Sequence, residues 1–236
     1  MTERGESTVT QTKNLFKVGP SSLRWENNKL LVEIDELTTP HLSRLKGRII
    51  IEPHFITNIE VPLMNDGTHI WRPFSPMSKI HVDLNVRGWT WSGHGYLDGN
   101  FGTRALEQDF SYWTWSRLAR ETGAMAFYDA KRRDGTDLNL GLDFQMKEKI
   151  QVIEDVPKVK FPRSNWQVYR ETRSDAGYKP YQIQNMLDTP FYSRSKIRTK
   201  IMGSETEGVH EALDLNRFAN PLIKPMLALR IPRKQD

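Results

Sequence analysis

The chain contains no cysteine among its 236 residues. Disulfide bonds and thiolate metal sites are therefore excluded, which is compatible with a reducing cytoplasm. Long apolar runs are also missing, because a run such as Ile49–Ile51 is far shorter than the roughly 20 residues that a membrane-spanning helix needs. Met1–Glu6 contains no apolar stretch, so we expect no signal peptide there. The sequence thus predicts neither a disulfide scaffold nor a transmembrane helix.

The chain also lacks a dense run of charge of either sign. Its net charge is +5, and its basic residues are scattered, with small clusters at Lys131–Arg133 and at Arg230, Arg233 and Lys234. Neither cluster has the density of a nucleic-acid-binding arm, so we expect no nucleic acid partner. A solvated surface explains such clusters most simply, and a peripheral contact with an anionic membrane is the alternative.

Aromatic residues, in contrast, are plentiful. Seven Trp, ten Phe and seven Tyr accompany an apolar content of 37%, which a packed globular protein needs and a disordered chain lacks. The length suffices for one large β domain or for two smaller ones that share an interface.

Short strands separated by turn residues account for most of the chain. Leu23–Trp25 and Leu30–Ile34 flank Glu26–Lys29 in the pattern of a β-hairpin. Arg48–Ile51 is a β-branched strand that ends before Pro53. Ile80–Val86 alternates strictly between apolar and polar residues, which is typical of a strand with one buried face.

The second half of the chain continues this pattern. Met125–Ala130 and Leu138–Phe144 are expected to form a hairpin through Arg133–Thr136, whose Asp-Gly step is a strong turn signal. Helix is expected only near Leu215–Ala219 or Pro221–Leu229. Further strands are predicted at Trp166–Thr172, Tyr181–Leu187, Ser195–Met202 and Gly208–Leu213.

Many short strands with little helix predict an all-β fold made of barrel or sandwich units. We expect a boundary near residues 110–120, so that the aromatic stretch Phe110–Trp115 lies where two β units meet. The predicted domains are an N-terminal β unit at residues 1–110 and a C-terminal β unit at residues 111–236 with a short C-terminal helix.

The segment Gly93–Gly102 is the most informative for function. Its four glycines would let the backbone turn tightly and approach another surface closely. Tyr96 and Asp98 are two residues apart, as are His69 and Trp71, so each pair shares one face of an extended strand. Two strands could thus present both pairs to one cavity. The alternative is that the Asp caps a turn and the Trp packs in the core.

Other kinds of site find no support in the sequence. The Gly93–Gly102 run is not a nucleotide fingerprint, since no Gly-x-Gly-x-x-Gly precedes a helix and no phosphate-loop lysine follows. No Ser or Thr lies in a nucleophile elbow. No metal site is expected, because no two histidines have helical ligand spacing or form a His-x-His pair. The six histidines are His41, His54, His69, His81, His94 and His210.

A family resemblance extends over nearly the whole chain, in several long motifs that follow one another in the same order. These motifs are Gly93–Gly102, Thr103–Phe110, Tyr112–Arg117, Phe127–Gly135, Asn185–Ser195, Val209–Leu215 and Lys224–Leu227. Through them the chain resembles the bacterial carotenoid 1,2-hydratases, also known as hydroxyneurosporene synthases. The resemblance implies two lipocalin-like (calycin-type) β units. It also implies hydration of the terminal double bond of acyclic carotenoids, without a cofactor.

The resemblance also selects site residues. The family's His-x-Trp and Tyr-x-Asp pairs fall on His69, Trp71, Tyr96 and Asp98, the four residues that spacing had grouped. We expect Asp98 to donate a proton to carbon and Trp71 to face the resulting cation. His69 or Tyr96 would position the attacking water. Candidates for lining a polyene channel, with core packing as the alternative, are Trp89, Trp91, Trp113 and Trp115.

The implied partners are an acyclic carotenoid such as neurosporene or lycopene, water and membrane lipid. We therefore expect a cytoplasmic protein peripherally associated with the inner (intracytoplasmic) membrane. Two alternatives stay open: a lipocalin-like carrier of a hydrophobic ligand, and a terpenoid or polyketide cyclase of the same superfamily. An acid that faces a closed apolar pocket would favour an enzyme over a carrier, and access of water would favour a hydratase over a cyclase.

The beginning of the chain departs from the family pattern. Met1–Gly5 resembles an internal segment of longer family members. The first β unit is therefore expected to lack strands, which would expose sheet edges.

Overall fold

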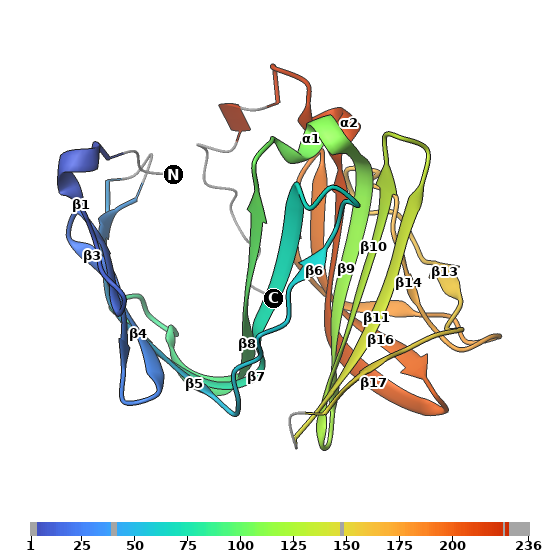
Figure 1. Ribbon diagram of the computed structural model, residues 1–236, viewed down its shortest axis with the longest axis horizontal. Helices are drawn as coiled ribbons and strands as arrows, with labels where there is room; N and C mark the ends of the chain where they lie inside the picture. Colours follow the sequence, from blue (N-terminus) through green and yellow to red (C-terminus); the bar gives the residue numbers. More distant parts are fainter. Residues whose placement is uncertain (1–3, 39–41, 147–148, 224, 227–236) are drawn as a thin grey trace. The chain divides into compact units, whose positions relative to one another are not determined.

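The structure is a computed structural model that describes residues 4–38, 42–146, 149–223 and 225–226 (Figure 1). In this part of the chain the fold is all-β, with antiparallel sheets, as predicted. Helix there consists of α1 (Leu106–Asp109), α2 (Leu215–Phe218), the 3-10 turn η1 (Glu6–Thr8) and 3-10 geometry at residues 225–226. None of the described helices has the length and apolar character that crossing a membrane requires.

The chain divides into two compact units. Among the described residues, the first unit comprises mainly residues 4–60 and 72–99, and the second mainly residues 61–71 and 100–223. Strand β7 (His69–Leu84) begins in the second unit and continues in the first, and strand β8 (Thr90–Gly102) returns in the opposite sense. The assignment of residues 1–110 and 111–236 to separate domains stays a prediction.

An eight-stranded sheet makes up most of the first unit. Its strand order is β1-β2-β3-β4-β5-β7-β6, and β8 pairs with β7. Besides β7 and β8, its strands are β1 (Val9–Gln11), β2 (Leu15–Val18), β3 (Ser21–Glu26), β4 (Lys29–Leu37), β5 (Arg44–Pro53) and β6 (Val61–Pro62). The predicted first hairpin is confirmed by the pairing of Glu26 with Lys29. Asn27 and Asn28 between them have φ of 50° and 59°, the left-handed conformation that asparagine tolerates in two-residue turns.

The two faces of this sheet differ in chemistry. Cross-strand neighbours form one apolar row at Phe16, Leu23, Val32, Ile49 and Val82. The next row along the strands is polar and consists of Lys17, Ser22, Glu33, Arg48 and Asp83. Because side chains alternate between faces along a strand, the two rows lie on opposite sides of the sheet. The sheet therefore has one apolar face and one charged face.

A seven-stranded sheet makes up the core of the second unit, in the order β12-β11-β10-β9-β17-β16-β15, and a two-stranded sheet pairs β13 with β14. The strands are β9 (Phe110–Arg120), β10 (Gly123–Arg132), β11 (Asp137–Gln145), β12 (Ile150–Val152), β13 (Lys158–Lys160), β14 (Glu171–Arg173), β15 (Tyr181–Asp188), β16 (Tyr192–Ile201) and β17 (Ser204–Asp214). The predicted β10–β11 hairpin is confirmed, with Gly135 at a φ of 89° in its turn.

Three local predictions have different outcomes. The strand expected at Trp166–Thr172 is wrong, since only β14 forms there. A turn precedes it, in which the amide of Gln167, at a φ of 62°, donates to the carbonyl of Ser164. The helix expected at Leu215–Ala219 is confirmed as α2. The alternative helix at Pro221–Leu229 lies partly outside the described residues.

Protein side chains occupy the interior of the second unit. An apolar cluster includes Leu118, Phe127 and Ile197. Beside it, the buried Arg170 guanidinium donates to the carbonyl of Pro162 at 2.7 Å and lies 4.6 Å above the ring of Phe161. Each buried polar group here is costly unless it is hydrogen-bonded, so these contacts fix the segment that precedes β14 against the sheet. The interior is thus packed by the chain itself.

His210 gives this interior a pH dependence. Burial lowers the pKa of its imidazole from 6.5 to about 3, although Nε2 donates to the carbonyl of Glu171. Below pH 6.5 the unfolded chain binds a proton that the folded chain does not, so the free energy of unfolding should fall as pH decreases toward 3. We expect His210→Gln to reduce this slope by up to roughly 1.4 kcal/mol per pH unit in urea unfolding. The same pH dependence of the free energy of unfolding in the wild type and in His210→Gln would contradict this role of His210.

Candidate functional site

A buried histidine at the start of β7 is the centre of the best-defined polar cluster in the second unit. Nε2 of His69 lies 2.7 Å from Oδ2 of Asp109, the last residue of α1. Arg104 donates from Nε to Oδ2 of the same carboxylate at 3.1 Å and from Nη2 to Oδ1 at 2.9 Å. A bidentate guanidinium fixes both position and orientation of a carboxylate. Arg104, Asp109 and His69 therefore form one connected chain of charge-assisted hydrogen bonds.

The opposite nitrogen of the imidazole, Nδ1, does not contact Asp109. With Asp109 as the acceptor, Nε2 carries the hydrogen, and in a neutral imidazole Nδ1 then carries the lone pair. No hydrogen bond joins Nδ1 to any described residue. Gly102 lies against it, because a Cβ built on Gly102 would stand only 2.5 Å from Nδ1. Glycine at this position leaves room for the ring in its observed place. The imidazole of His69 is thus oriented by a carboxylate through Nε2.

Trp71 lies two residues further along β7 and is buried in an aromatic cluster. Its ring centroid is 5.7 Å from that of Tyr128 on β10, and the ring of Tyr128 lies 5.8 Å from that of Trp113 on β9. The ring of His69 packs 5.3 Å from Phe110. The alternation of strand residues places Trp115 on the same side of β9 as Trp113. One face of the second sheet therefore presents aromatic rings next to the His69 cluster.

A second carboxylate belongs to this aromatic face. Glu211 on β17 is the cross-strand neighbour of Trp115, and its side chain is largely buried in an ion pair with Arg194, at 3.4 Å. Neither Glu211 nor Asp109 is among the functional residues predicted from the sequence. Both fall within motifs that carry the family resemblance, but their partners lie far away in the chain. Spacing alone could not have grouped them.

Tyr96 and Asp98 belong to the first unit. Both lie on β8, both are partly exposed, and their spacing places them on one face of the strand. The structure thus groups His69 with Trp71 in one unit and Tyr96 with Asp98 in the other, on two strands that pair with each other. A pocket shared by all four residues stays a prediction.

The glycines around Asp98 matter because they lack a side chain, and not because the backbone turns at them. Gly93, Gly95 and Gly102 lie within β8, and none has a left-handed φ, so the tight turns expected in Gly93–Gly102 are wrong. The close approach is confirmed, because a Cβ on Gly95 would overlap the side chain of Ile80 on β7. The glycines let neighbouring side chains lie directly on the backbone of β8.

The four candidate channel residues divide between the units. Trp113 and Trp115 contribute to the aromatic face of the second unit, and Trp115 is buried. Trp89 and Trp91 lie in the first unit and are exposed. Whether any of them lines a polyene channel stays a prediction.

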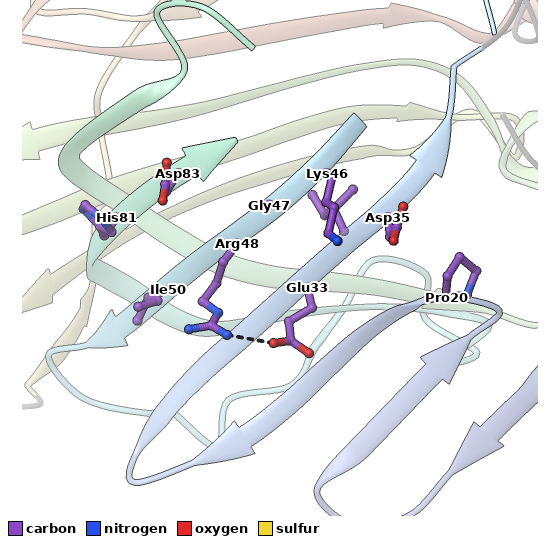
Figure 2. A pocket seen from close by; sticks show the side chains of 10 residues that line it. Pro20, Glu33, Asp35, Lys46, Gly47, Arg48, Ile50, His81 and Asp83 are labelled. Atoms are coloured by element: carbon purple, nitrogen blue, oxygen red, sulfur yellow. Dashed lines mark hydrogen bonds and ion pairs between the residues drawn. The ribbon is translucent and has the colours of Figure 1, made fainter. Parts of the chain in front are cut away.

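The charged face of the first sheet carries a groove of about 510 Å³. Figure 2 shows that β4, β5 and β7 contribute side chains of both signs to it, and Arg48 donates to Glu33 at 2.9 Å. Such a lining does not suit an extended hydrocarbon. Within the described residues, no three His, Asp or Glu side chains gather closely enough to hold a metal ion.

Comparisons with known proteins agree over the full length of the chain. A family model described as carotenoid hydratase CrtC matches residues 1–236. The acyclic carotenoid 1,2-hydratase of Cereibacter sphaeroides is 50% identical over 235 residues, which cover 99% of this chain and 84% of the relative. The enzyme of the same name from Rhodobacter capsulatus is 48% identical over 236 residues, with the same coverage.

A solved structure gives a more distant likeness. The crystal structure of CghA with Sch210972 superposes with a TM-score of 0.50 at 13% identity, covering 86% of this chain and 68% of that one. At this identity the likeness concerns the fold alone, which is lipocalin-like.

Proposed function

The chain belongs to the carotenoid hydratase family, and from that premise we propose that it hydrates the C1–C2 double bond of an acyclic carotenoid such as neurosporene or lycopene. The observation that carries the proposal is the buried His69–Asp109 pair beside the indole of Trp71. An imidazole held by a carboxylate suits activation of water, and an indole face suits a carbocation. The reaction class is that of a hydro-lyase.

The chemistry of the substrate defines what the site must supply. An isolated alkene has no polar group, so the difficult step is transfer of a proton to C2, which leaves a tertiary cation at C1. A water oxygen then bonds to C1 and loses one proton to a base. One water is added in total and no electron is gained or lost, so the balance requires no redox cofactor. We propose that the enzyme needs none.

We assign the proton donor to Asp98. A carboxyl group can donate to carbon only if it is protonated, and cover by an apolar substrate disfavours its ionised form. Asp98 is partly exposed, so a bound polyene would complete its burial. After the transfer, the new carboxylate stabilises the nearby cation electrostatically. Tyr96, on the same face of β8, would hydrogen-bond Asp98 or the water.

His69 takes the second proton. Nδ1 accepts a proton from the water as its oxygen bonds to C1, and the resulting imidazolium is stabilised by Asp109 through Nε2. Arg104 holds that carboxylate in place. Asp109 and Arg104 are therefore positioning residues, because they act through His69.

Trp71 offers its π-face to the cation, and its replacement separates this role from packing. Trp71→Phe keeps an aromatic face. Trp71→Leu removes the aromatic face and keeps only apolar volume. Because a desolvated cation–π contact is worth about 2 kcal/mol, Trp71→Leu should lower kcat about 30-fold and Trp71→Phe should retain much of the rate. Turnover of lycopene per folded protein measures both. Equal kcat values in the two variants would remove Trp71 from the mechanism.

The location of the enzyme follows from its substrate. Acyclic carotenoids reside in the lipid bilayer, so we propose a cytoplasmic protein that contacts the inner (intracytoplasmic) membrane peripherally. The net charge of +5 supports attraction to anionic lipid.

The experiment that tests the proposed function is direct. Purified protein is incubated with lycopene in detergent micelles without added cofactor, and the product is examined by mass spectrometry. A gain of one water per hydrated end supports the hydratase. Tight binding of unchanged lycopene would instead indicate a carrier.

A further inference from the structure

Exposed apolar side chains gather at one end of the first sheet. We call the group of Leu37, Leu42, Trp89 and Trp91 the tryptophan edge. Leu37 ends β4, Leu42 lies in the loop between β4 and β5, and Trp89 and Trp91 stand at the start of β8. Their exposed fractions are 57%, 66%, 37% and 48%. Large apolar side chains are ordinarily the most buried in a protein, so such a group indicates a surface made for a partner.

Hydrogen bonds bring the two loops of the tryptophan edge together. Leu37 pairs with Arg44 where β4 ends and β5 begins. The side chain of Asn85, in the loop between β7 and β8, accepts from the amide of Lys46 at 2.6 Å and donates to the carbonyl of Arg44 at 3.2 Å. The amide of Leu84 donates to the carbonyl of Trp89 at 3.2 Å. Both loops therefore emerge side by side from one end of the sheet.

The backbone of Leu42 is a second sign of function. Leu42 has a φ of 50°, in the left-handed region that non-glycine residues rarely adopt. Such a conformation costs about 1 kcal/mol or more, and here it holds a leucine with two thirds of its surface in solvent. A partner that buries the leucine would offset this cost.

The charge beside the tryptophan edge identifies the partner. Arg44, Lys46 and Arg87 are exposed at the same end of the sheet. Arg44 is held by Asp35 at 2.7 Å, and Lys46 interacts electrostatically with the same carboxylate, whereas in the described part of the chain no ion pair joins Arg87 to a carboxylate. One exposed cation without an ion pair there, Arg87, thus lies at the same end of the sheet as the four apolar side chains. This combination suits the surface of a lipid bilayer, where headgroup phosphates border the hydrocarbon core.

We propose that the tryptophan edge docks the protein on an anionic lipid bilayer, with Leu42 and the two indoles at the level of the headgroups and Arg87 against lipid phosphate. Indole rings favour this interfacial position, and each nearby cation adds electrostatic attraction. The purpose of such docking, access to a carotenoid dissolved in the bilayer, rests on the proposed function. The docking itself does not, because it concerns lipid alone.

Co-sedimentation with carotenoid-free vesicles tests the proposal. The vesicles contain phosphatidylcholine with about 30 mol% phosphatidylglycerol. The wild-type protein should bind, and the W89A/W91A double variant should lose affinity about tenfold or more. The R87Q variant should bind more weakly, and about 0.5 M KCl should weaken the wild type likewise. The matched control is W166A, which removes an indole that is 54% exposed in the second unit and should bind as the wild type does.

The contrary outcomes are equally definite. The proposal is overturned if W89A/W91A and the wild type bind alike, or if W166A loses as much affinity as the double variant does. Self-association of the wild type that W89A/W91A abolishes, without vesicle binding, would show that a second copy covers this surface instead. The vesicles hold no carotenoid, so the two experiments are independent. Absence of vesicle binding would not contradict the hydratase activity, and absence of hydration would not contradict docking on lipid.

Discussion

Replacing Asp98 with asparagine is expected to abolish hydration while the protein stays folded. The amide cannot donate a proton to carbon, and it cannot become the anion that stabilises the cation. General acid catalysis contributes roughly 10²- to 10⁴-fold, so kcat/KM for lycopene in micelles should fall by at least the lower figure. Because Asp98 is partly exposed on β8, the substitution should leave the thermal unfolding midpoint close to that of the wild type.

A carboxylate elsewhere on the same sheet provides the control. Glu33 lies on the charged face of β4, in an ion pair with Arg48. Glu33→Gln converts a carboxyl group of the first unit to an amide just as Asp98→Asn does, but it should leave kcat/KM unchanged. If Asp98→Asn instead formed hydroxylated carotenoid at the wild-type rate, another group would have to be the acid.

His69→Gln is expected to produce the second large effect, a loss of about 10²-fold or more in kcat with little change in KM. The substitution removes the base at Nδ1, whereas the polyene would still be held by apolar contacts. Asp109→Asn should also lower kcat, because the asparagine cannot orient and stabilise the imidazolium. The exposed His54 offers a matched control, and His54→Gln should have no effect.

The double variant separates catalysis from structure. If Asp109 acts through His69, then His69→Gln/Asp109→Asn should be no slower than His69→Gln alone. Asp109 with a purely structural role would instead lower kcat further, by the same factor in either background. Additive losses in kcat would therefore contradict the positioning role, even if both single variants were slow.

Local signals in the sequence were sufficient for the hairpins. Asn27 and Asn28 tolerate the left-handed backbone that a two-residue turn requires, and Gly135 does the same between β10 and β11. The strand predicted at Trp166–Thr172 failed for the opposite reason. Its alternating apolar residues resemble a strand, but the turn at Ser164–Gln167 and the buried contacts of Arg170 decide the backbone there.

The site was only partly readable from the sequence. The spacing of two residues predicted that His69 and Trp71, and Tyr96 and Asp98, share strand faces, and the structure places each pair within one strand. The same spacing could not show that the first pair is buried and the second only partly so. Asp109 is forty residues from His69, and their contact depends on α1 meeting the start of β7. No periodicity encodes such a contact, so the residue that orients the base needed the structure.

Turnover of lycopene in doubly labelled water, D₂¹⁸O, tests the central claim most directly. If Asp98 protonates carbon and His69 activates water, each hydrated end should carry one carbon-bound deuterium at C2 and one ¹⁸O hydroxyl at C1, and the Asp98→Asn variant should yield neither. Contradiction would be a product without deuterium on carbon, or a cyclised carotenoid without oxygen, formed by the wild-type protein.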